Sequence, residues 1–206
     1  MSASGAAGRR LWLVRHGETE GQSSIRFHGS NDVRLSDHGR GQIRALAPLL
    51  QHVPFVRVVH SPLQRAAESA AILATACNLP STALVADGRL REISFGACEG
   101  MTEAEIAAAF PAFFAAYRAG RHANFPEGEP RLEFAQRVAA AVHELAGEAW
   151  QGDLLVVAHR GTVRQALRAL LAVPVGQPDD FGVELASVSV VRQLGAWQLE
   201  ALGLLP

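Results

Sequence analysis

The sequence predicts an α/β fold, a three-layer α/β/α sandwich with a mostly parallel central sheet and a C-terminal antiparallel hairpin. Three observations predict it. Short apolar runs alternate with amphipathic helical patterns along the 206 residues, which is typical of a largely parallel sheet covered on both faces. The runs at 11–14 and 154–158 are apolar throughout, as in strands buried on both faces. Residues 187–202 alternate in polarity around Gly195, as in a β-hairpin.

The expected elements are bounded by helix caps and breakers. Ser36 is a typical helix N-cap, Pro54 ends the helix that Ser36 opens, and Pro62 suits the first turn of the next helix. Pro111 interrupts a third helical pattern. The expected strands cover residues 11–15, 55–59, 83–86, 154–158, 187–193 and 197–202. The expected helices cover residues 36–51, 62–78, 101–114, 131–150 and 162–171.

The length predicts one domain, because 206 residues are enough for one large core and too few for two. We expect a flexible N-terminal tail at 1–10, a single domain over 11–206 and a small helical cap insertion around 93–130. The tail is small, polar and basic, unlike a secretory signal, and the apolar runs are too short to span a membrane. These features predict a cytoplasmic protein.

Composition limits the classes of chemistry and of partner. The net charge of −1 gives no bias toward nucleic acid or a membrane surface, so neither is expected as a partner. Every basic residue is arginine, which excludes a Schiff-base lysine and a Walker-type lysine. Cys77 and Cys98 are far apart in the sequence and are expected to be free thiols in a reducing compartment.

Two histidines follow the two most apolar predicted strands. His16 follows the strand at 11–15, next to Arg15, and His159 follows the strand at 154–158. Arg65 lies in the first turn of a helix that leaves a third strand, where helix N–H groups also favour an anion. Parallel strands bind ligands beyond their carboxyl ends, so we expect these side chains at one edge of the sheet. Arginine with imidazole suits a phosphate group.

Four segments carry a more specific pattern. They hold Arg15-His16-Gly17, Arg65, Glu92 and His159, and they cover residues 13–19, 61–66, 90–100 and 156–161. In this order they resemble the histidine phosphatase superfamily, the phosphoglycerate-mutase-like proteins. A local likeness to the α-ribazole-phosphatase-like members of the phosphatase branch lies at the N-terminal strand and at the helix that starts near Glu129.

The resemblance implies a hydrolase of phosphomonoesters that acts on a small phosphorylated metabolite. It implies that His16 becomes phosphohistidine and that Arg15, Arg65 and His159 bind the phosphoryl group. It implies that Glu92 protonates the leaving oxygen and then activates water. No cofactor and no metal are expected. Three further residues are expected to bind phosphate or substrate, namely Gln22, His28 and Gly161.

The sequence departs from the family pattern at three places. Gln22 stands where the family often has asparagine, Arg160 replaces a glycine after the second histidine, and Pro130 replaces a serine in a Gly-Glu-Ser segment. These changes leave the identity of the substrate open.

Several alternatives stay open at this stage. Glu18 and Glu99 compete with Glu92 as the acid, because both lie in glycine-flanked turns. His28 is a solvated loop residue in the rival interpretation, and His60 ends a strand at the same edge as His16. The chain has no H-E-x-x-H motif, so a metal site is the weaker hypothesis.

A cofactor-dependent phosphoglycerate mutase and a non-catalytic phosphate-binding module are the rival functions. The compact segment 95–129 and the lack of lysine favour the hydrolase. A homodimer stays open.

Overall fold

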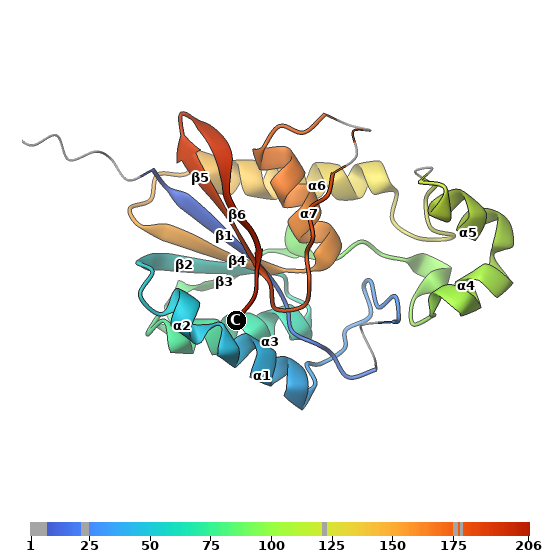
Figure 1. Ribbon diagram of the computed structural model, residues 1–206, viewed down its shortest axis with the longest axis horizontal. Helices are drawn as coiled ribbons and strands as arrows, with labels where there is room; N and C mark the ends of the chain where they lie inside the picture. The colour runs from blue at the N-terminus through green and yellow to red at the C-terminus, as the bar shows by residue number, and fades with distance from the viewer. Residues whose placement is uncertain (1–7, 22–24, 121–122, 175–176, 178) are drawn as a thin grey trace, which may run out of the picture.

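The computed structural model describes residues 8–21, 25–120, 123–174, 177 and 179–206 (Figure 1). A six-stranded sheet lies at its centre, in the order β3-β2-β4-β1-β5-β6. β1, β4, β2 and β3 run parallel to one another, whereas β5 is antiparallel to both β1 and β6. The strands are β1 (Arg10–Arg15), β2 (Phe55–His60), β3 (Leu84–Ala86), β4 (Asp153–Ala158), β5 (Val188–Leu194) and β6 (Ala196–Leu204). The predicted mostly parallel sheet with a C-terminal hairpin is confirmed.

Helices cover both faces of the sheet, so the predicted three layers are present (Figure 1). One face packs on α1 (Asp37–Ala45), α2 (Ala47–Leu50) and α3 (Gln64–Ala76) through side chains such as Ile43 and Leu73. The other face packs on α6 (Arg131–Gly147) and α7 (Arg160–Leu170) through side chains such as Val138 and Leu167. All six residues of β4 are buried, as expected for a central strand between two helical layers.

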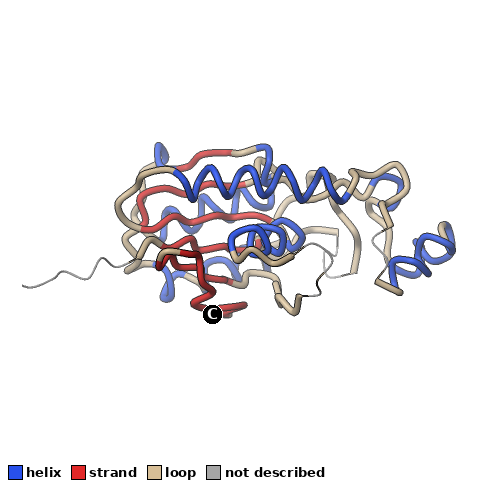
Figure 2. The backbone as a smooth tube through the Cα atoms, turned by 90° about the horizontal axis from the view of Figure 1, so that it is seen from above, coloured by secondary structure: helices blue, strands red, loops and turns tan. Residues whose placement is uncertain are grey.

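Two short helices extend the molecule past the carboxyl edge of the sheet. Figures 1 and 2 show α4 (Glu103–Ala109) and α5 (Pro111–Arg118) at the end of the molecule toward which β1 points. Three 3₁₀ turns lie between β3 and α4 or just before β3, namely η1 (Ser81–Ala83), η2 (Gly88–Leu90) and η3 (Gly96–Cys98). None of the described helices is long and apolar enough to cross a membrane.

Two boundaries differ from the sequence prediction. The helix expected over 36–51 divides at Leu46, because Pro48 has no N–H to donate to the Arg44 carbonyl. The tail expected over 1–10 ends earlier, because β1 begins at Arg10 and the Arg9 guanidinium lies 4.5 Å from the centre of the Trp150 ring. Residues 1–7 lie outside the described part of the chain.

Candidate active site

The two predicted histidines meet beyond the carboxyl ends of adjacent strands. His16 follows β1 and His159 follows β4, and these strands are paired in register from Leu11↔Leu154 to Arg15↔Ala158. Their rings lie edge to face with centroids 5.1 Å apart. Both side chains are buried, with 5% of His16 and 1% of His159 exposed. The parallel register therefore brings together two imidazoles that are separated by most of the chain.

The hydrogen bond of His16 defines which ring nitrogen carries the proton. Nδ1 lies 2.7 Å from the Gly17 carbonyl oxygen, which can only accept, so Nδ1 donates. Burial lowers the pKa of His16 well below its usual value, and the charges of Arg65 and Arg15 lower it further. The ring is therefore neutral at physiological pH, and Nε2 holds a free lone pair. A neutral imidazole with an available nitrogen is a nucleophile.

His159 is held in the opposite tautomer. Arg65 Nε donates to Nδ1 at 3.2 Å, so the proton is on Nε2, which donates to Ser61 Oγ at 2.8 Å. Burial and the charge of Arg65 lower the pKa of His159 well below its usual value. Ser61 follows β2, so its side chain comes from the third adjacent strand of the sheet.

Two arginines supply positive charge beside the histidines. Arg65, at the start of α3, also donates to the Asn31 and Gly29 carbonyls, each at 2.7 Å, and burial lowers its pKa. Arg15 donates from Nη1 to the Val183 carbonyl at 2.9 Å. Its Nε is buried with no hydrogen-bond partner in the described part of the chain. Burial and then the charge of Arg160 lower the pKa of Arg15 to about 10.

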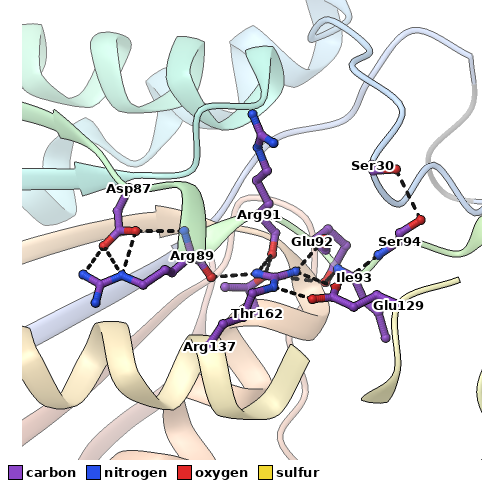
Figure 3. A network of polar contacts seen from close by, with 10 residues as sticks. All are labelled: Ser30, Asp87, Arg89, Arg91, Glu92, Ile93, Ser94, Glu129, Arg137 and Thr162. Carbon is purple, nitrogen blue, oxygen red and sulfur yellow. Dashed lines mark hydrogen bonds and ion pairs between the residues drawn. The ribbon is translucent and has the colours of Figure 1, made fainter. Parts of the chain in front are cut away.

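Glu92 lies between η2 and η3 and is buried. Gly161 N–H donates to its Oε2 at 2.9 Å. Ile93 N–H donates to its Oε1 at 3.1 Å (Figure 3). A Cβ atom on residue 161 would lie 2.5 Å from Oε1, so a larger residue there would displace this carboxylate. Gly161, which the sequence predicted to bind substrate, thus contacts Glu92.

The remaining candidates differ in their placement. The two rival carboxylates have structural partners: Glu18 accepts from Ser36, and Glu99 accepts from Ser30.

His28 lines the same cavity as Glu92, and its Nε2 lies 3.1 Å from the Gly21 carbonyl. His60 is buried and bonds the Ser61 carbonyl. Gln22 lies outside the described residues. Among the residues described, no group of three His, Cys, Asp or Glu side chains is arranged to hold a metal.

A cavity of about 1330 Å³ opens over these groups. Arg15, His16, Arg65 and Glu92 all line it. Its lining also includes five aromatic residues, namely Phe27, Phe95, Tyr117, Phe125 and Phe134. The arginines suit a phosphate group, and the aromatic side chains suit an organic leaving group.

Comparisons with known proteins agree with this geometry. The profile of the histidine phosphatase superfamily (branch 1) matches residues 11–203. The chain belongs to the histidine phosphatase superfamily. The predicted family and the prediction of a phosphomonoester hydrolase are therefore confirmed.

The phosphatase is similar to several characterised relatives. It is 36% identical to a glucosyl-3-phosphoglycerate phosphatase of Mycolicibacterium vanbaalenii over 81% of this chain and 76% of the relative. It is 31% identical to an adenosylcobalamin/alpha-ribazole phosphatase of Salmonella typhimurium over 88% of this chain and 89% of the relative. The solved structure of the mycobacterial glucosyl-3-phosphoglycerate phosphatase with VO3 covers 95% of this chain at a TM-score of 0.84 and 31% identity.

Sequence reasoning missed several residues of the phosphatase that contact this site. Ser61 was seen only as part of a segment, although its position directly after a strand is the same signal that identified His16. Arg137 was read as one residue of an amphipathic helix, yet it donates to the Glu92 carbonyl at 3.1 Å. Its distance of 45 residues along the chain from Glu92 gives no local signal.

Proposed function

We propose that His16 is the nucleophile of this phosphatase. The observation that carries the proposal is the Nδ1–H bond to the Gly17 carbonyl, since it leaves the Nε2 lone pair free on a residue that lines the cavity together with Arg15 and Arg65. In the first step a P–N bond forms at Nε2 and the P–O bond of the ester breaks. The product is an alcohol and a phosphohistidine on His16.

In this proposal Arg15 and Arg65 hold the phosphoryl group, and His159, whose ring nitrogens bond Arg65 and Ser61, joins them by exchanging its Ser61 contact for a phosphate oxygen. Three of the five N–H groups of Arg65 donate to His159, Asn31 and Gly29, so two remain for phosphate oxygens. The buried Nε of Arg15 supplies another donor. Fixed donors of this kind stabilise the charge that moves onto the leaving oxygen and the phosphoryl oxygens in the transition state.

Glu92 acts as the general acid and then as the general base. Its protonated carboxyl gives a proton to the leaving oxygen as the P–O bond breaks. It then takes a proton from the water that attacks phosphorus, and the P–N bond breaks to release orthophosphate. Its buried place on the wall of the cavity that His16 also lines supports this role, whereas neither Glu18 nor Glu99 is among the described residues that line this cavity.

We further propose that the substrate is a small phosphomonoester whose alcohol part carries a carboxylate. Arg160 lines the cavity directly after His159 and, within the described residues, makes no hydrogen bond or ion pair through its side chain. The neighbouring Arg164 and Arg168 are both paired with Asp179 at 2.6 Å. Relatives named glucosyl-3-phosphoglycerate phosphatase and phosphoserine phosphatase 1 support this class, because glycerate and serine are carboxylic acids.

A phosphoenzyme measurement tests the nucleophile. Rapid quench with a labelled phosphomonoester is expected to trap label that is acid-labile and base-stable, and His16→Asn is expected to abolish both label and turnover. His60→Asn is the matched control, because His60, at the end of β2, also bonds the next residue's carbonyl through Nδ1, at 2.9 Å. Label that survives His16→Asn overturns the assignment, as does loss of label in His60→Asn alone.

A further inference from the structure

The Arg137 guanidinium of α6 spans the segment that carries Glu92 (Figure 3). Its Nη1 donates to the carbonyls of Arg89 and Arg91 at 2.7 and 2.8 Å. Its Nη2 donates to the Glu92 carbonyl at 3.1 Å. Nε and Nη2 donate to the two carboxylate oxygens of Glu129, at 2.6 and 2.7 Å. All five N–H groups of this side chain therefore have a defined acceptor.

Glu129 fixes the other side of the same segment. It accepts from Ser94 N–H at 3.4 Å through Oε2, and its own N–H donates to the Ser94 carbonyl at 3.0 Å. The Arg137–Glu129 pair is half-buried, with 24% and 19% of the side chains exposed. The Phe134 ring packs against the Arg137 guanidinium, with 4.8 Å between Cζ of Arg137 and the centre of the ring. The main chain is thus held on both sides of Glu92.

The carboxylate of Glu92 is held from a different helix. Gly161 N–H, in α7, donates to Oε2, and Thr162 Oγ1 donates to the Arg91 carbonyl at 3.1 Å. Since α6 and α7 pack together in the core, the backbone and the carboxylate of Glu92 are fixed against one rigid layer.

We infer that Arg137 and Glu129 form a clamp that positions Glu92 for proton transfer. Arg137 is a positioning residue, since it holds the backbone of Glu92. The inference rests on the proposed role of Glu92 as the acid. A lysine at 137 cannot replace it, because one ammonium with three donors cannot serve a carboxylate and three carbonyls together. The clamp places the acid where the leaving oxygen departs, and proton transfer is sensitive to such placement.

The test compares two esters that differ in their need for an acid. Nitrophenyl phosphate has a good leaving group and glycerol phosphate a poor one. Arg137→Ala is expected to lower kcat on glycerol phosphate by about 10²-fold, the loss that a small misplacement of a reacting group causes. On nitrophenyl phosphate the expected loss is only a few-fold, and KM is expected to stay nearly constant for both. Arg137→Lys and Glu129→Gln alter the clamp less than Arg137→Ala does. They are expected to lower kcat on glycerol phosphate more than on nitrophenyl phosphate, but by smaller factors. Guanidinium added to Arg137→Ala is expected to restore part of the activity on glycerol phosphate.

The matched control is Arg40→Ala. Arg40 pairs with Glu68 at 2.6 Å with the same 24% exposure as Arg137, but on the opposite helical layer. Arg40→Ala is expected to leave the ratio of kcat on glycerol phosphate to kcat on nitrophenyl phosphate unchanged. Glu92→Gln with Arg137→Ala is expected to be no slower on glycerol phosphate than Glu92→Gln alone.

The outcomes separate the two claims. If Glu92→Gln slows both esters equally, Glu92 is not the acid and the proposed function is wrong in that part. If Glu92→Gln is selective for glycerol phosphate, the clamp is overturned by any of three results. These are an equal loss on both esters in the Arg137 and Glu129 variants, no loss in them, or the same selective loss in Arg40→Ala.

Discussion

Nε of Arg65 donates a 3.2 Å hydrogen bond to Nδ1 of His159, and this bond fixes the tautomer of the second histidine. Because Nδ1 accepts, the proton lies on Nε2 and is directed to Ser61 Oγ. The His159 ring is therefore oriented by a buried arginine on one side and a buried serine on the other.

Ser61→Ala is expected to lower kcat/KM for nitrophenyl phosphate by about 2- to 10-fold, the effect of one net hydrogen bond. The variant leaves the His159 Nε2–H without its acceptor and lets the ring turn. Ser69→Ala is the control, since Ser69 is equally buried but bonds the Arg65 carbonyl within α3. The measurement is the steady-state kcat/KM of both variants. Equal values for Ser61→Ala and Ser69→Ala would show that the Ser61 hydroxyl has no role in the site.

The free energy of unfolding is expected to fall as pH drops below about 6.5. The folded-state pKa values of His16 and His159 are lowered, so the unfolded chain binds protons that the native state does not. This stability is complete above pH 6.5 and decreases by up to about 1.4 kcal/mol per pH unit for each histidine. Urea denaturation between pH 7.5 and 5.5 measures the slope. His159→Asn is expected to reduce this slope, and an unchanged slope would contradict the lowered pKa of His159.

Gly161→Ala is expected to displace the Glu92 carboxylate and so to slow the ester with the poor leaving group most. The added Cβ would lie 2.5 Å from Oε1, so the carboxylate must move. The expected loss is about 10²-fold on glycerol phosphate and smaller on nitrophenyl phosphate. Gly147→Ala is the control, because nothing lies within 4 Å of its added Cβ. Kinetics on both esters check the prediction, and equal losses on both would argue against it.

Arg160→Ala is expected to change the choice of substrate. We expect KM for phosphoserine and 3-phosphoglycerate to rise about 10-fold, the effect of one charge-assisted hydrogen bond, with little change for glycerol phosphate. Arg168→Ala is the control, since Arg168 also lines the cavity but is paired with Asp179. The same panel, followed by phosphate release and by formation of 2-phosphoglycerate, measures any isomerase activity. A KM change that is equal for all three esters would contradict the carboxylate proposal.

The sequence allowed the strand-end residues to be predicted because parallel strands share one carboxyl edge. A strand followed by His16 and a strand followed by His159 need only lie side by side for the rings to meet. The helix break at Leu46 was missed because Ser36 and the apolar spacing fit one long helix, although Pro48 carried the signal.

The contacts of Glu92 could not be predicted from the sequence. They depend on Arg137 and Gly161, which lie on two helices whose relative placement is decided by core packing. A charged residue on an amphipathic helix is ordinarily solvated, so the position of Arg137 gave no sign that it binds the main chain of another segment.

The adjacency of β2, β4 and β1 has an evolutionary consequence. These neighbouring strands bring Ser61, His159 and His16 to one edge, whereas the cavity is also lined by exposed residues such as Ile25 and Leu132. Such exposed positions can change without disturbing the hydrogen-bonded centre. A duplicated gene for this fold can therefore acquire a new metabolite through them, while it inherits the centre intact.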